Sequence, residues 1–450
     1  MTYQVVFATF FFPRLADVHS RAISGTLALV MFLIGSVLAS AGASVSTYAA
    51  GVIFHSVGSS GLAILPFLFV SDYTSLRWRG MALAGVYFVP LIITWIAAPI
   101  NERLSSNWAF GTFGIIVFVI CTPALSVLHL VASKHPEEVQ QKQTPLIHKF
   151  MNGFVRMDPI GLSIFTIGFG LVDYNTDVWW DVEVREQPRQ VAMLIIGFIL
   201  IFPVFTLWEV CLSSFPVMPR WVFQKRGVLF AVIIASCCRA ATMLPLRATV
   251  YYSHPEWSLK TSNYYFNAAS MGRAVLAPVF GCLFLLTRRY KAYMLLGGTM
   301  LIVSCALGLH SVRNAHLPDI LPSTALLFAI QILEGVGEIA IVMGTTVGSQ
   351  ASVPHNDLAT VVGVVNVIPI FVSVLSPSSV AVRMRTRESG DSIFTTLYSL
   401  AAGFAVPCLI FTFFMPNYRL GNTHNAVEQH GPNSSANTAT ETDHSSVENI

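Results

Sequence analysis

Two glutamates, Glu334 and Glu338, lie four residues apart within a long apolar run of the sequence, residues 323–346. Residues at this spacing share one face of a helix, and two neighbouring carboxylates bind a proton more tightly than one carboxylate alone. Ionisable groups at membrane depth are costly unless they face a cavity or a partner. Both glutamates are therefore candidates for proton binding, and a purely structural partner for each is the alternative interpretation.

Three arginines also lie inside apolar runs: Arg239, Arg247 and Arg273. Guanidinium groups in such places can line a path for an anionic ligand, which makes Arg239 and Arg273 substrate candidates. The alternative is that the long side chains reach the membrane interface, and this alternative suits Arg247 best. Glu209, beside Trp208, lies at the end of its apolar run, and we expect it to anchor that end at the interface.

The composition is that of a protein embedded in lipid. Hydrophobic residues make up 54% of the 450 residues and charged residues only 11%, whereas soluble domains carry about 25% charged residues. A spanning helix needs about 20 apolar residues. The sequence therefore predicts an all-α, polytopic membrane protein with twelve full spans after an N-terminal half-span, Val5 to Pro13. The expected full spans are 24–43, 48–70, 80–100, 109–131, 158–175, 191–211, 228–250, 264–286, 292–311, 323–346, 358–380 and 393–415.

Loop charges orient these spans. With residues 14–21 placed on the cytoplasmic side, 15 Lys and Arg residues lie on that side and 8 on the other, as the positive-inside rule requires. Arg383, Arg385 and Arg387 are the exception, because they fall together in an outside loop.

The chain divides into four parts by composition. Residues 1–131 form an N-terminal helical bundle, and residues 132–157 form a polar cytoplasmic linker of mixed charge. Residues 158–415 hold the remaining spans, including a C-terminal bundle. Residues 416–450 contain almost no large apolar side chains, so we expect a disordered cytoplasmic tail.

Several classes of function are excluded. The seven cysteines are scattered without a Cys-x-x-Cys pair, the histidines lack metal-ligand spacing, and no phosphate-binding loop occurs, so we expect no metal, no cofactor and no enzyme activity. The net charge of +3 is too small to indicate nucleic-acid binding.

A family resemblance rests on several short stretches. Residues 14–21 (RLADVHSR) resemble the loop after the second helix of major facilitator transporters. Residues 47–54 (TYAAGVIF) and 71–80 (SDYTSLRWRG) resemble the fungal siderophore–iron transporters, a fourteen-span branch of that superfamily. Shorter matches are 143–146 (QTPL), 158–161 (DPIG), Trp208-Glu209 and 418–421 (YRLG).

The resemblance implies a cytoplasmic gate. Asp17 and Arg21 match the latch that holds helix ends together on the cytoplasmic side, and Asp72, Arg77 and Arg79 match the corresponding loop two helices later. In the family these residues are gate elements rather than ligand contacts. The resemblance implies that such an Asp–Arg pair breaks when the carrier opens inward.

The sequence departs from the family in three places. The family's first span is absent, so the chain starts partway into the second. Pro13 and Arg14 stand where the family has a glycine before its Leu-Ala-Asp, and Ser20 stands where it has one before the arginine. The long extracellular loop before the last span is reduced to residues 383–391.

The function that the resemblance implies is proton-coupled transport of a ferric siderophore or similar organic anion by alternating access. We expect a monomer in the plasma membrane or in an endosomal or vacuolar vesicle. An export antiporter for glutathione or drugs on the same scaffold is one alternative. A truncated, non-transporting remnant or sensor is another, which the missing first span favours.

Overall fold

A computed structural model describes residues 2–42, 44–103, 106–134, 153, 155–178, 187–251, 259–314, 324–384, 390–423 and 425–426. Most of the expected linker, the tail from residue 427 and the side chains of Arg383, Arg385 and Arg387 lie outside this description. Nearly all of the described chain is helical and the described ranges contain no strand, which confirms the all-α class.

The described ranges consist of helical elements joined by turns and loops. In order, they are α1 (Thr2–Val18), α2 (Arg21–Ala41), α3 (Val45–Tyr73), α4 (Leu76–Arg103), α5 (Ser106–Lys134), α7 (Pro159–Val178), α9 (Pro188–Ile199), the π-helix η2 (Leu200–Val204), α10 (Phe205–Leu207), the π-helix η3 (Trp208–Leu212), α11 (Arg220–Gln224), α12 (Arg226–Tyr251), α13 (Leu259–Thr287), α14 (Lys291–Asn314), α15 (Thr324–Ala351), the 3-10 helix η4 (His355–Asp357), α16 (Leu358–Met384) and α17 (Gly390–Phe414).

Among the described residues, 10 helices are long and apolar enough to cross a membrane, which confirms a multi-pass membrane protein. The other two expected spans, 80–100 and 158–175, lie in the helices α4 and α7.

The polar stretch 14–21 is not the loop that the sequence predicted. Helix α1 continues through Pro13 to Val18, and α2 begins at Arg21, so only His19 and Ser20 separate the two helices. The reason is that Leu15 and Ala16 are buried, and their packing extends the helix beyond the proline.

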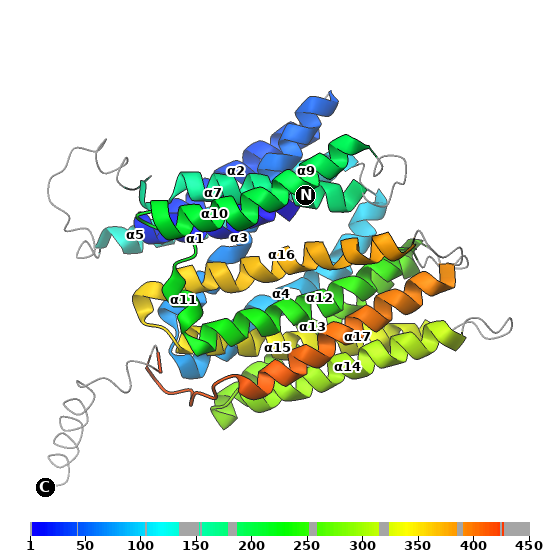
Figure 1. Cartoon of the computed structure of the whole chain (residues 1–450). Helices are drawn as coiled ribbons and strands as arrows, with labels where there is room; N and C mark the ends of the chain where they lie inside the picture. Colours follow the sequence, from blue (N-terminus) through cyan, green and yellow to red (C-terminus); the bar gives the residue numbers. More distant parts are fainter. Residues whose placement is uncertain are drawn as a thin grey trace, which may run out of the picture.

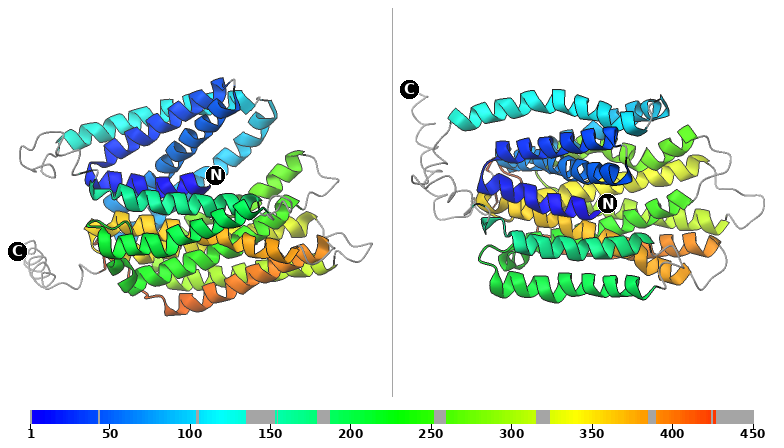
Figure 2. Two further views of the ribbon diagram at one scale, coloured as in Figure 1. Left: turned by 45° about the horizontal axis from the view of Figure 1, so that its top comes forward. Right: turned by 90° about the horizontal axis from the view of Figure 1, so that it is seen from above.

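The helices form two groups that meet along two seams (Figure 1). Helices α1 to α5 make the N-terminal group, and α12 to α17 make the C-terminal group. One seam runs where α1 lies along α16, and the other where α4 lies along α13. Helix α4 packs on α13 much more extensively than on α3. Helix α5 lies at the outer edge of the bundle in both views of Figure 2.

Glycines let α2 and α3 approach closely. A Cβ atom at Gly35 would lie 2.1 Å from the backbone N of His55, and one at Gly58 would lie 2.2 Å from the backbone N of Phe32. Small residues at such crossings are the usual packing device of transmembrane helices. These glycines therefore serve helix packing.

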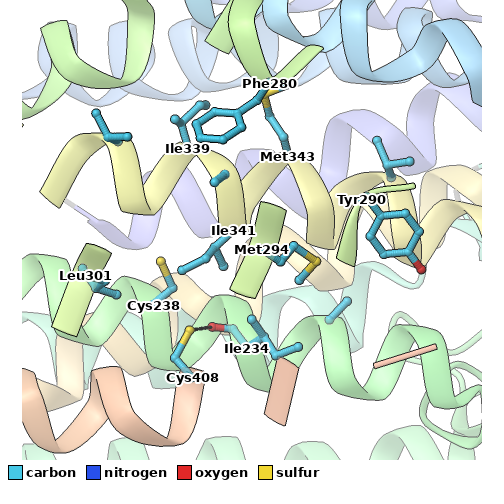
Figure 3. Packing of buried hydrophobic residues seen from close by; sticks show 14 of the residues in the cluster. Ile234, Cys238, Phe280, Tyr290, Met294, Leu301, Ile339, Ile341, Met343 and Cys408 are labelled. Atoms are coloured by element: carbon cyan, nitrogen blue, oxygen red, sulfur yellow. Dashed lines mark hydrogen bonds between the residues drawn. The ribbon is translucent and has the colours of Figure 1, made fainter. Parts of the chain in front are cut away.

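Buried hydrophobic residues pack the helices of the C-terminal group together (Figure 3). Three of these helices carry Arg239, Arg273 and Glu338. Ile234 of α12, Met294 and Leu301 of α14 and Ile341 of α15 are completely buried in this core. Cys408 Sγ of α17 donates to the Ile234 carbonyl oxygen at 3.6 Å. This packing positions α12 against α15 and α17.

After α17 the chain turns back over the helix ends as a segment that we call the C-terminal strap, residues 415–423 with Asn425 and Ala426 (Figure 1, red). The backbone N–H groups of Leu76 and Arg77 donate to the carbonyl oxygens of Thr423 and Gly421, both at 3.0 Å. Leu420 is completely buried. The prediction of a disordered tail from residue 416 was therefore wrong for residues 416–423 and 425–426.

Candidate functional site

Three helices bring charged side chains together at their midpoints. Arg239, Arg273 and Glu338 lie near the centres of α12, α13 and α15. Arg273 Nη1 donates to Glu338 Oε2 at 2.7 Å, and Arg239 Nη1 lies 3.5 Å from Glu338 Oε1. Ser270, one turn before Arg273, accepts a hydrogen bond from its Nη2 at 2.6 Å. Because Glu338 is only 6% exposed, its charge depends on these two arginines.

The three side chains face a cavity of about 360 Å³. It lies between the two groups of helices, with α3 and α4 on one side and α12, α13, α15 and α16 on the other. Its walls are formed by Phe67, Tyr87, Pro90, Ala235, Cys238, Arg239, Ser270, Arg273, Glu338, Ile339, Val342, Thr345, Thr346, Val365, Asn366, Pro369 and Ile370.

Glu334 lies one turn before Glu338 but does not line this cavity. It is 3% exposed, and its Oε2 atom has no hydrogen-bond partner among the described residues. Glu334 interacts electrostatically with the charges of Glu338 and Arg273. It also interacts electrostatically with the buried thiol of Cys305 on α14. The sequence named the two glutamates as proton candidates and the two arginines as substrate candidates, without joining them. The structure brings Arg239, Arg273 and Glu338 together and leaves Glu334 outside the cavity wall.

The candidate gate residues form an ion network at one end of the N-terminal group. Arg21, the first residue of α2, lies 2.5 Å from Asp17 Oδ1 at the end of α1 and 2.8 Å from Asp72 Oδ2 at the end of α3. Burial raises the pKa of Asp17, and the charge of Arg21 acts in the opposite direction. Ser20 caps α2 by accepting from the Ile23 N–H. The network thus joins three helix ends of one group.

Arg77 and Arg79 do not join this network. Arg79 is completely buried, and its Nη2 donates to the carbonyl oxygens of Ser71 at 2.9 Å and Thr74 at 3.0 Å. It therefore satisfies the open C-terminal carbonyls of α3. The Nε atom of Arg77 has no partner among the described residues, and its backbone N–H binds the C-terminal strap.

Sequence reasoning missed a second polar cluster, which fastens α7 to the helix α9–η3. Asp158 Oδ1 accepts from Trp208 Nε1 at 2.9 Å and from the Gly161 N–H at 3.1 Å, and its Oδ2 accepts from Ser213 Oγ at 2.7 Å. Both Asp158 and Trp208 occur in stretches that carried the family resemblance. A search for polar partners of those two residues would have found this cluster.

Glu209 is the second carboxylate of this region. Its oxygens accept from the backbone N–H groups of Val217 at 2.8 Å and Met218 at 3.1 Å. Arg14 of α1 donates to the carbonyl oxygens of Arg156 and Pro216 on either side of the cluster. Glu209 therefore holds a turn of the chain that follows its helix, a contact more specific than the interface anchoring that the sequence predicted.

Curated relatives with sequence similarity are fungal. A siderophore transporter of Zymoseptoria tritici is 28% identical over 79% of this chain and 57% of its own length. Siderophore iron transporter 1 of Saccharomyces cerevisiae is 24% identical over 67% and 50%. The low affinity heme transporter str3 of Schizosaccharomyces pombe is 27% identical over 77% and 57%. The chain thus spans about half the length of these relatives, and they confirm the resemblance to fungal siderophore–iron transporters.

A solved structure and a family model give the same answer for the fold. The proton:xylose symporter XylE superposes with a TM-score of 0.52 over 95% of this chain and 88% of its own, at 12% sequence identity. The model of the Major Facilitator Superfamily matches residues 2–377. Transporters of this kind are not enzymes. The chain is therefore a multi-pass membrane protein that belongs to the Major Facilitator Superfamily.

Proposed function

We propose that this chain carries a ferric siderophore or a similar organic anion across a membrane together with protons. The observation that supports the proposal most is the cavity between the two groups of helices, with Arg239, Arg273 and Glu338 in its wall. Charged side chains at membrane depth that face a cavity mark substrate and ion pathways. The fungal relatives supply the substrate class, since several are siderophore transporters by name.

Glu334 is the proton site in this proposal. A buried carboxylate oxygen without a hydrogen-bond partner is costly when charged. Because Glu334 Oε2 has no partner among the described residues, we expect Glu334 to be the carboxylate that carries the proton. Glu338 forms ion pairs with two arginines. The two neighbouring glutamates therefore have different tasks: Glu334 takes up and releases the proton, and Glu338 positions the arginines.

The gate in this proposal is the network of Asp17, Arg21 and Asp72. Alternating access requires the N-terminal group to rock against the C-terminal group around the cavity, along the seams α1–α16 and α4–α13. The network holds the ends of α1, α2 and α3 together in this state, and we expect it to break when the carrier opens inward.

Uptake of radioactive iron supplied as ferric siderophore tests the function. In a cell without its own siderophore carriers, we expect cells that produce this chain to accumulate iron from acidic medium and to stop when a protonophore collapses the proton gradient. A full-length fungal relative in the same cell is the positive control. Absence of uptake from correctly inserted protein, with the relative active, contradicts the proposal.

Replacing Glu334 by glutamine tests the proton site. Because Gln cannot release a proton, we expect Glu334→Gln to bind the chelate but to lose the acceleration of uptake by acidic medium. Uptake should be at least about tenfold slower, which corresponds to an activation barrier higher by about 1.4 kcal/mol. The measurement is initial uptake rate against external pH. Full pH-dependent uptake by this variant refutes the assignment of the proton to Glu334.

Replacing Arg21 by glutamine tests the gate. The variant loses two charge-assisted contacts, each of which contributes about 1.5–3 kcal/mol, so we expect uptake to fall more than about tenfold while equilibrium binding of the chelate is unchanged. Arg289→Gln is the matched control, because Arg289 is an exposed arginine whose side chain makes a single 3.3 Å hydrogen bond to a backbone carbonyl. Equal uptake by both variants argues against a gate at Arg21.

A further inference from the structure

Arg239 and Arg273 share one carboxylate but are held very differently. Arg273 has short contacts to Glu338 at 2.7 Å and to Ser270 at 2.6 Å. Arg239 reaches Glu338 only at 3.5 Å, and its guanidinium makes no hydrogen bond within the described part of the chain. Its side chain is 37% exposed, against 29% for Arg273. Arg273 is thus a fixed part of the wall, and Arg239 keeps its donors available to a ligand.

The charges in the cavity wall do not cancel. Among the described lining residues, Arg239 and Arg273 carry positive charges and Glu338 a negative one, which leaves one net positive charge. An excess charge in a poorly hydrated cavity is costly unless an opposite charge meets it. A ligand with a net negative charge offsets this cost, and a neutral or cationic ligand does not.

Glu334 links this charge to the proton. The groups that interact electrostatically with Glu334 are Glu338 on its own helix, Arg273 on α13 and Cys305 on α14. Arg273 in turn interacts with Tyr87 of α4. Protonated Glu334 adds no charge, so the cavity keeps its excess positive charge. Ionised Glu334 places a negative charge behind Arg273 and cancels it. Proton and anion therefore favour each other's binding.

We propose that Arg239 recognises the charge of the ligand and that the cavity selects ferric chelates with a net negative charge over neutral or cationic chelates of the same shape. The rings of Phe67 and Tyr87, 5.6 Å apart at their centroids, offer an apolar surface to the body of the chelate. This inference rests on the proposed function, because it takes the chelate to occupy this cavity.

A set of three chelates isolates the charge. A linear trihydroxamate loses three protons when it binds Fe³⁺, so its metal centre is neutral and a terminal amine sets the net charge. The free amine gives a cationic complex, its acetyl amide a neutral one, and its succinyl amide an anionic one. Equilibrium binding to the purified full chain and uptake into cells are measured for all three complexes.

We expect the succinyl complex to bind and enter at least about tenfold better than the acetyl complex, and the amine complex to be the poorest. In Arg239→Gln this preference disappears. Arg239→Lys retains part of it, because lysine keeps the charge but not the planar fork that binds a carboxylate with two hydrogen bonds. Arg289→Gln, with the same change of charge away from the cavity, keeps the preference of the unmodified chain.

Each outcome separates the inference from the function beneath it. Uptake without a charge preference, or with a preference that Arg239→Gln leaves unchanged, overturns the inference while transport stands. Charge-selective binding that depends on Arg239, without uptake, supports the inference and overturns transport. Absence of both binding and uptake overturns both. Gel filtration of each variant shows whether it is folded.

Discussion

The variant Arg273→Gln is expected to have a much lower melting temperature than the unmodified chain. The substitution leaves Glu338, which is only 6% exposed, without the contact of 2.7 Å that compensates its charge. Breaking a buried ion pair by removing one partner costs about 3–5 kcal/mol. Arg239 compensates little of this, because it lies 3.5 Å away and its side chain is more exposed.

The control is the double variant Arg273→Gln with Glu338→Gln. Removing both charges removes the penalty of an unpaired carboxylate, so we expect its melting temperature to recover most of the loss, with a coupling energy above about 1 kcal/mol. Uptake of the chelate does not recover, because the positive wall is gone. Melting curves in detergent measure stability, and equal losses in the single and double variants contradict the pairing.

The helices and their membrane environment could be predicted from the sequence, because each span is a long apolar run with polar ends. What composition could not give is the behaviour of the polar ends themselves. Residues 14–18 continue α1 since Leu15 and Ala16 are buried, and burial at a helix end depends on neighbours far away in sequence. For that reason the sequence alone could not predict that only two residues connect α1 and α2.

The candidate site was predictable by residue type but not by role. Spacing placed Glu334 and Glu338 on one face of a helix, yet four residues turn the helix by about 40° beyond a full turn. That offset is enough to place Glu338 in the cavity wall and Glu334 behind it. The partners of Glu338 come from α12 and α13, and no local pattern identifies them.

The stretch 418–421 had only a family resemblance to explain it, and the structure supplies the physical reason. Tyr290 Oη donates to the Pro416 carbonyl at 2.5 Å, the Leu420 N–H donates to the Arg288 carbonyl at 3.1 Å, and the Ala426 N–H donates to the Ala351 carbonyl at 3.2 Å. A few hydrogen bonds and one buried leucine fold a segment whose average composition indicates disorder.

The C-terminal strap leads to the second large effect. Ending the chain at Met415 is expected to prevent stable folding, whereas ending it at Ala426 is expected to leave stability unchanged. The chain that ends at Ala426 keeps every described strap contact, so it is the matched control. The truncation at Met415 removes Leu420 from the core that it shares with Leu76 and Tyr290 and removes the acceptors of the first N–H groups of α4.

A point substitution separates packing from hydrogen bonding within the strap. Leu420→Ala removes a completely buried side chain and keeps the backbone contacts, and we expect it to cost about 2–5 kcal/mol. Leu420→Met, which nearly conserves volume, costs less than about 1.5 kcal/mol. Fluorescence-detected gel filtration after heating measures both. If Leu420→Ala and the truncation at Met415 both melt like the unmodified chain, the strap contributes nothing to the fold; if only the truncation fails, its hydrogen bonds outweigh its packing.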